Sequence, residues 1–203
     1  MQMSSKAIKK RRRLVYIITL SSVVMVVAIY WWHWQAPYRK LRLFLRALET
    51  GDIQTLYSLT PKRYERQICG LTPELIDKTY QQVLKPLFSE YRLVYIRRTS
   101  MSGLIPEIWI RSHVVPFQLK FRNRQGKTLF VLADVVWYHD EGWVVPWGIF
   151  VWKLLINTYG REQADVLMVG LGYDLIHSSR PGEMISVRRD LSLIRTGKIK
   201  SYR

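Results

Sequence analysis

Residues 91–98 read YRLVYIRR, and at this stretch the pattern of apolar residues along the chain changes. Before it, apolar side chains recur at the three- and four-residue spacing of an amphipathic helix. From it onward they alternate with polar residues, and many of them are β-branched. The sequence therefore predicts helices first and strands second, an order that is typical of the α+β class.

The segment YRKLRLFLRALETGD, residues 38–52, predicts an amphipathic helix. One helical face carries four spaced apolar side chains, Leu41, Phe44, Leu45 and Leu48. Gly51 is a typical helix stop, and Asp52 can cap a short helix over residues 53–60. This pattern predicts two consecutive helices whose apolar sides face a core.

Two Thr-Pro pairs follow, Thr60-Pro61 and Thr72-Pro73. In each pair a capping hydroxyl precedes a proline at the first helical position. The second pair predicts a helix over residues 73–88, which Pro86 should end or kink.

Four runs after residue 90 predict strands, and they cover residues 91–98, 107–123, 128–140 and 142–147. Turns at residues 123–127 and 140–142 each contain a glycine, as hairpin loops prefer. Pro116 within the second run implies a bulge, an edge position or a break. The strands should therefore form an antiparallel meander.

Residues 161–176 predict a further helix, and residues 184–203 predict a polar, basic extension with a partly disordered end.

The run LVYIITLSSVVMVVAIYWWHW, residues 14–34, contains no charged side chain. At about 1.5 Å per residue, its roughly 21 residues span about 30 Å, the thickness of a bilayer's hydrocarbon core. A cleaved signal peptide would have a shorter apolar stretch and small residues at its end. The run is flanked by residue types that prefer the membrane interface, Arg11, Arg12, Arg13, Trp31, Trp32 and Trp34.

These features predict an uncleaved anchor in the cell (inner) membrane, with the N-terminus in the cytoplasm and the remaining chain outside. The predicted divisions are a basic cytoplasmic segment (1–13), the anchor (14–34), an exported domain (37–155) and a C-terminal helix and basic tail (156–203). The net charge of the chain is +17, and six cations but no acid precede the anchor, which leaves 26 cations against 15 acids after it.

A basic exported domain does not meet nucleic acid, so its surplus charge indicates anionic lipid head groups, anionic wall polymers or a solvated surface. Cys69 is the single cysteine, which excludes an internal disulfide and a cysteine-based metal site. The four histidines, at positions 33, 113, 139 and 177, are too far apart for a ligand motif. No metal and no cofactor are expected.

The segments FLRALETGDIQTLYSLT (44–60) and WYHDEGWVVPW (137–147) resemble the nuclear transport factor 2-like, or cystatin-like, cone fold. Members of that family often begin with a helix and a Gly-Asp step, and often end on a hairpin with Gly-Trp after an acidic turn. The resemblance covers residues 37–155. It implies helices packed on a curved antiparallel sheet.

An anchor followed by one such domain is similar to two groups of proteins. One is the inner-membrane scaffold subunit of type IV secretion systems, from which this chain departs in its long basic tail. The other is the N-terminal domain of methicillin-resistance-type penicillin-binding proteins, whose Trp-x-x-x-Trp strand end resembles Trp143 to Trp147. This chain lacks their transpeptidase domain. Both resemblances imply a domain that is not itself catalytic.

Candidate acid/base residues are His113, Asp134, His139, Asp140 and Glu141. The last three lie at a predicted turn, where water should solvate them. Asp134 lies in the middle of a strand, so it is either a base in the cone or a carboxylate paired with Arg122 or Arg124. The aromatic residues Trp137, Trp143, Trp147 and Phe150 either line a ligand pocket or fill the core.

The sequence thus favours a non-catalytic scaffold or protein-interaction module in the cell envelope, with the lipid bilayer and an envelope protein or a second copy as partners. The alternatives are a lipid or small-ligand binder that uses the cone pocket, and an enzyme that uses Asp134 as its base. A filled cone with an exposed apolar edge would favour the scaffold. An open apolar cavity would favour the binder, and a cavity containing Asp134 would favour the enzyme.

Overall fold

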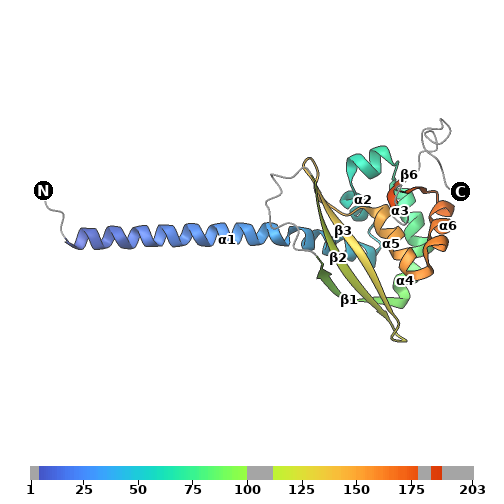
Figure 1. Cartoon of the computed structure of the whole chain (residues 1–203), viewed down its shortest axis with the longest axis horizontal. Coiled ribbons are helices and arrows are strands. Elements are labelled where there is room, and N and C mark those ends of the chain that lie inside the picture. Colours follow the sequence, from blue (N-terminus) through green and yellow to red (C-terminus); the bar gives the residue numbers. More distant parts are fainter. Residues whose placement is uncertain (1–4, 100–111, 178–183, 189–203) are drawn as a thin grey trace. The chain divides into compact units, whose positions relative to one another are not determined.

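The computed structural model describes residues 5–99, 112–177 and 184–188, with side chains for residues 15–99 and 114–173. The chain divides into two compact units, Met1–Ala36 and Pro37–Arg203. The second unit combines helices with a four-stranded antiparallel sheet (Figure 1). The predicted α+β class is therefore confirmed.

Helix α1 spans Ser5–Thr50 and contains both the predicted anchor and the helix predicted after it. The sequence predicts two separate segments here, and the structure corrects this to one helix that includes Pro37. Proline has no N–H to donate to the preceding turn, so it weakens a helix without always ending it. The boundary between the two units falls immediately before Pro37.

The apolar part of α1 is, within the described residues, the single helix that is long and apolar enough to cross a membrane. Trp31 and Trp32 are 64% and 65% exposed, and the apolar residues before them are exposed as well. Thr19 and Ser22 donate hydroxyl hydrogen bonds to carbonyls four residues earlier, which satisfies these polar groups inside the helix. The helix is consistent with a membrane anchor. The predicted interfacial side chains of Arg11, Arg12 and Arg13 lie outside the described residues.

Short helical segments follow α1: α2 Ile53–Leu59, the π-helix η1 Lys62–Ile68, α3 Pro73–Thr79, the π-helix η2 Tyr80–Leu84 and α4 Lys85–Glu90. The predicted caps at Asp52 and Thr72 are confirmed, since each side chain accepts a backbone N–H from the first turn, at 3.0 and 3.3 Å. The same prediction for Thr60 is wrong. Its hydroxyl donates to the Tyr57 carbonyl at 2.8 Å and so closes α2 instead of opening η1.

The sheet contains β1 Tyr91–Arg98, β2 Ser112–Asn123, β3 Thr128–Tyr138 and β4 Gly142–Val144. The strands pair antiparallel in chain order, and the sheet curls strongly around the helices (Figure 1). Gly126 and Gly142 have φ angles of +84° and +72° in the two predicted hairpin turns, which are confirmed. Pairing of β2 with β3 continues through Pro116 without a shift, so the bulge and break interpretations of Pro116 are wrong. β2 is not an edge strand, because it lies between β1 and β3, and the Pro116 carbonyl accepts the Thr99 backbone N–H at 3.1 Å just beyond the end of β1.

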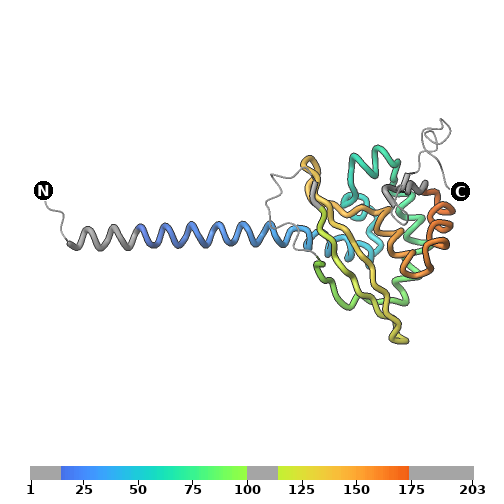
Figure 2. Tube along the Cα trace, viewed as in Figure 1, coloured from blue at the N-terminus to red at the C-terminus, as the bar shows by residue number. Residues whose placement is uncertain are grey.

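The chain continues with α5 Trp147–Tyr159, α6 Arg161–Leu171 and a hairpin of β5 Asp174–His177 and β6 Met184–Arg188. Figure 2 shows α6 beside the green segment of α3, where Lys78 Nζ donates to the Leu171 carbonyl at 2.9 Å. The predicted helix over 161–176 ends at Leu171, and the predicted extension begins as strand β6. Residues 189–203 lie outside the described residues.

Helix α5 is a correction, because the sequence predicts a strand up to residue 147 and a domain end at residue 155. Six of the 13 residues of α5 have buried apolar side chains, and Gly148 is buried with them. A short run that is apolar on all sides does not distinguish a buried helix from a buried strand. Pro146, which cannot donate a ladder hydrogen bond, precedes its first residue.

The core lies between the helices and the inner face of the sheet. The predicted apolar face of α1 is buried, with Phe44 fully so. The Phe44 ring lies 6.2 Å from the Trp147 ring and 5.0 Å from the Phe150 ring, both in edge-on arrangements. These contacts join α1 to α5. They explain why residues about a hundred positions apart form one domain.

Candidate functional site

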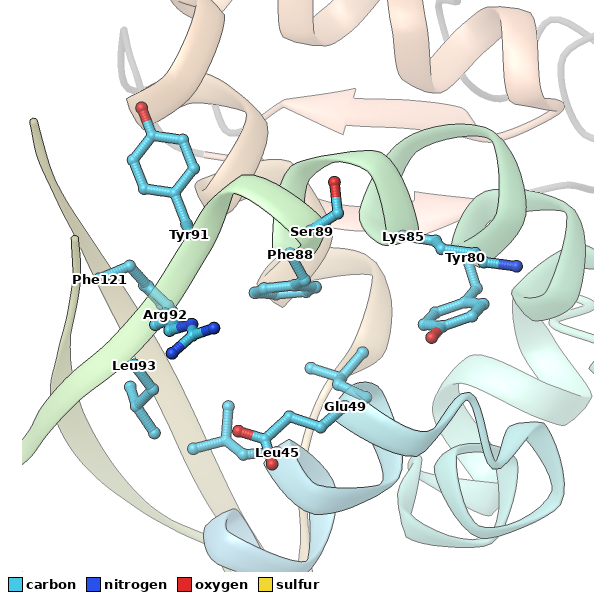
Figure 3. Close-up of a pocket in the computed structure, with 11 residues that line it drawn as sticks. Leu45, Glu49, Tyr80, Lys85, Phe88, Ser89, Tyr91, Arg92, Leu93 and Phe121 are labelled. Atoms are coloured by element: carbon cyan, nitrogen blue, oxygen red, sulfur yellow. The ribbon is translucent and has the colours of Figure 1, made fainter. Parts of the chain in front are cut away.

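A pocket of about 570 Å³ lies between the end of α1, the segments η2 and α4, and the start of β1. We call it the α1–β1 pocket. Its volume falls within the range of about 300–1,000 Å³ that is typical of ligand sites. All its lining residues belong to the second unit, and its apolar side chains come from four elements (Figure 3): Leu45, Leu48, Phe88, Leu93 and Phe121.

One wall of the α1–β1 pocket depends on the Gly51-Asp52 step. Gly51 has φ of +70°, a conformation that side chains other than glycine rarely adopt. A Cβ atom at Gly51 would lie 3.0 Å from Cε1 of Tyr80, which lines the pocket and is 8% exposed. The glycine therefore ends α1 and also allows the Tyr80 ring to pack against the turn.

Charged side chains stand at the rim of the pocket: Glu49, Lys85 and Arg92. Figure 3 shows the Glu49 carboxylate and the Arg92 guanidinium turned toward the same space, whereas the Lys85 amine is turned away. Lys85 Nζ donates to Gln81 Oε1 at 3.2 Å. Within the part of the chain that the structure describes, neither Glu49 nor Arg92 has an ion-pair partner. The pocket thus combines an apolar floor with one unpaired anion and one unpaired cation.

The aromatic residues predicted as pocket candidates lie elsewhere. Trp143, Trp147 and Phe150 are 6%, 0% and 2% exposed, and none of them lines the α1–β1 pocket. These three side chains fill the core. The interpretation that they line a ligand pocket is therefore wrong, and the alternative, that they fill the core, is correct. Trp137 is half-buried beside Trp143, and its indole Nε1 has no hydrogen-bond partner among the described residues.

Asp134 forms an ion pair with Lys153 of α5, with 2.6 Å between Oδ2 and Nζ. The ion-pair interpretation is therefore correct, but the predicted partners are wrong, because the cation within ion-pair distance is Lys153 and neither Arg122 nor Arg124. Asp134 does not line the α1–β1 pocket. Both members of the pair are about a quarter exposed, so the pair contributes at most about 1 kcal/mol to stability.

Glu65 is the one buried carboxylate among the residues whose side chains the structure describes, and sequence reasoning missed it. It is 5% exposed, and its two oxygens accept the backbone N–H groups of Trp147 and Gly148, both at 2.9 Å. These are the first residues of α5, so Glu65 caps that helix from η1. Burial raises the pKa of Glu65 to about 7, against the lowering effect of the two N–H bonds and of Arg66.

Glu141 also departs from the sequence prediction, which left it solvated at a turn. Its carboxylate accepts backbone N–H groups from Lys62 and Arg63 and so caps η1; the bond from Arg63 is 2.9 Å long. His139 and Asp140 are exposed as predicted, with 3.2 Å between His139 Nδ1 and Asp140 Oδ1. These residues border a second pocket of about 660 Å³, but its carboxylate Glu141 is already engaged in capping.

Among the described residues, no group of three potential metal ligands comes together. His33 lies in the apolar part of α1, and His139 lies at an exposed turn. The side chains of His113 and His177 lie outside the described residues. The absence of a metal or cofactor stays a prediction.

No protein-family model matches this chain, and no curated protein and no solved structure matches it either. The functional inference therefore depends on the residues of the α1–β1 pocket and on the apolar helix that precedes them.

Proposed function

We propose that this chain is a single-pass membrane protein whose second unit is a non-catalytic binding domain for an amphipathic ligand. The observation that carries the proposal is the α1–β1 pocket, whose apolar floor and charged rim fit a ligand with an apolar chain and a polar head. The ion pair of Asp134 with Lys153 supports a non-catalytic domain, because this mid-strand carboxylate already has a cationic partner.

The position of the pocket along the chain supports a ligand that comes from the membrane. The apolar run ends at Trp34, and Leu45, which lines the pocket, comes eleven residues later. Even a fully extended chain of that length reaches only about 40 Å. Whatever the arrangement of the two units, Leu45 in the wall of the pocket stays within that distance of Trp34, which is predicted to lie at the membrane interface.

The proposed topology has the N-terminus in the cytoplasm and the binding domain outside, in the cell (inner) membrane. Six cations precede the apolar run, and four follow it closely: Arg39, Lys40, Arg42 and Arg46. Positive residues are enriched on the cytoplasmic side of membrane spans, so the larger group supports this orientation.

Protease protection in whole cells tests the topology. In a chain with different tags at its two ends, external protease should remove the C-terminal tag, and the N-terminal tag should survive until the membrane is permeabilised. The full chain should remain in the membrane fraction after alkaline carbonate washing, whereas a chain without residues 14–34 should not. Loss of the N-terminal tag first would contradict the orientation, and release of the full chain would contradict the anchor.

Native mass spectrometry of the full chain in mild detergent tests ligand binding. We expect a bound species with the mass of an amphiphile, because the apolar floor holds one chain. Leu93→Glu should abolish it by placing a carboxylate in that floor. Val94→Glu, on the neighbouring residue that is 51% exposed and does not line the pocket, is the matched control and should retain it. Equal occupancy in both variants would show that the amphiphile binds elsewhere.

A scaffold role is the second candidate, and the outer face of the sheet favours it. Val114, Phe130 and Leu132 are 47%, 43% and 47% exposed on neighbouring strands. Lys120 Nζ lies between two rings, 5.7 Å from the centroid of Tyr95 and 5.6 Å from that of Phe130. Such a mixed apolar and basic face fits an envelope protein with an acidic surface. In the same mass spectra, additional protein mass or a homo-oligomer would support this role.

We also propose that residues 37–155 belong to the nuclear transport factor 2-like cone fold. The order of helices before a curled antiparallel meander supports this assignment. The Gly51-Asp52 step at the end of α1 and the Asp140–Trp143 turn between β3 and β4 support it too, since members of that family often have such features there.

A further inference from the structure

We infer that the α1–β1 pocket recognises a single-chain zwitterionic phospholipid, with Arg92 at the phosphate and Glu49 at a primary amine. This inference rests on the proposed ligand-binding function and adds the chemical class of the ligand. It follows from the two unpaired charges at the rim, the apolar floor between them and the volume of the pocket (Figure 3).

The phosphate position follows from Arg92. Arg92 lies opposite Arg122 in the register of β1 and β2, and like charges directly opposite each other destabilise a sheet. A bound phosphate offsets this repulsion, and a guanidinium can hold phosphate through two parallel hydrogen bonds. Neither arginine has an ion-pair partner within the described residues. An anion bound beside Arg92 would therefore offset the repulsion between Arg92 and Arg122 at the start of β1.

The amine position follows from Glu49. Its carboxylate is turned into the same space as Arg92, and a lone anionic head group there would face a like charge (Figure 3). A head group with an ammonium next to its phosphate complements both residues. A primary amine also donates hydrogen bonds to the carboxylate, which a quaternary ammonium cannot do.

The acyl chain position follows from the floor, whose apolar side chains come from α1, α4, β1 and β2. A pocket of about 570 Å³ is the size of a drug-like ligand. That volume suits one acyl chain with its head group at the rim. The occupant is therefore a lysophospholipid with an ethanolamine-type head, taken from the bilayer.

The test is a native mass spectrometry titration of the full chain in mild detergent with three probes of equal chain length. The probes are lysophosphatidylethanolamine, lysophosphatidylglycerol and the free fatty acid. We expect the wild type to bind lysophosphatidylethanolamine at least about tenfold more tightly than the other two, the effect of about one charge-assisted hydrogen bond. Equal affinity for the three probes would overturn the head-group inference and leave the pocket as a non-selective amphiphile site.

Single substitutions assign the two contacts. Glu49→Gln should weaken lysophosphatidylethanolamine about tenfold and should not weaken lysophosphatidylglycerol. Arg92→Gln should weaken both phosphate-bearing probes. Arg97→Gln is the matched control, since Arg97 is an exposed arginine of the same strand that does not line the pocket, and it should change neither affinity.

The outcomes separate this inference from the proposed function. Binding that is lost in Leu93→Glu but unaffected in Glu49→Gln and Arg92→Gln keeps the ligand-binding function and overturns the head-group assignment. No binding of any probe to the wild type overturns both. Glu49 and Arg92 are exposed and Leu93 is half-buried. If the circular dichroism spectra of these three variants match that of the wild type, misfolding is excluded as the cause of a loss of binding.

Discussion

Replacing Trp147 with alanine is expected to destabilise the second unit by about 3–5 kcal/mol, the range for removing a large buried aromatic side chain. Trp147 is fully buried, packs edge-on against Phe44, and donates its indole N–H to the Tyr173 hydroxyl at 2.8 Å. That hydroxyl also lies 2.9 Å from Thr79 Oγ1, so the tryptophan joins α5 to α3. The measurement is guanidinium unfolding of the full chain in mild detergent, followed by circular dichroism.

Two variants make this measurement decisive. Trp147→Phe keeps an aromatic ring but removes the N–H, so it should lower the free energy of unfolding by less, about 1–3 kcal/mol. Trp32→Ala removes an exposed tryptophan of the apolar helix and should leave the unfolding of the second unit unchanged. If Trp147→Ala lowered ligand occupancy and left stability intact, Trp147 would be a pocket residue, and its assignment to the core would be wrong.

Replacing Glu65 with alanine is the second large effect, and it depends on pH. At pH 5 we expect a loss of about 3–5 kcal/mol, because two buried backbone N–H groups at the start of α5 lose their acceptor. Total domain stability is typically only about 5–15 kcal/mol. Unfolding of the full chain at pH 5 measures this loss, with Glu162→Ala, an exposed residue in the first turn of α6, as the control.

The pH dependence follows from the raised pKa of Glu65. Its pKa is 4.5 in the unfolded chain and about 7 in the folded one, so the folded state holds this proton more tightly. The stabilisation is complete below pH 4.5 and is lost as pH rises to about 7, by up to about 3 kcal/mol. The stability difference between wild type and Glu65→Ala should therefore narrow between pH 5 and pH 8.

Glu65→Gln tests the titration itself. The amide retains one acceptor oxygen but does not titrate, so its stability should lack the decline that the wild type shows between pH 5 and pH 8. A wild type whose stability follows the same pH profile as Glu65→Gln would show that Glu65 does not titrate in this range.

Local features of the chain were predictable wherever the signal lies within a few residues. Asp52 and Thr72 cap helices through the adjacent backbone, and Gly126 and Gly142 occupy turn positions that need a positive φ. The buried face of α1 follows from the spacing of four apolar side chains. Each of these depends on short-range geometry, which the order of residues records directly.

Features that depend on distant partners were not predictable. Glu65 meets α5 across 82 residues, Glu141 meets η1 across 79, and Asp134 meets Lys153 across 19. None of these carboxylates has a local signal that names its partner. Thr60 illustrates the same limit, because its Thr-Pro pattern fits a cap, whereas the N–H groups of η1 take their acceptor from Glu141.

The sequence by itself determined the α+β order, the apolar helix at the N-terminus and the hairpins, because these follow from periodicity, length and turn residues. Only the tertiary structure decided that α5 is a helix, since an apolar segment takes the conformation that its packing partners favour. Tertiary packing also placed the pocket: it buried Trp147 and Phe150 and left an apolar space between α1, α4 and β1, three segments that only folding brings together.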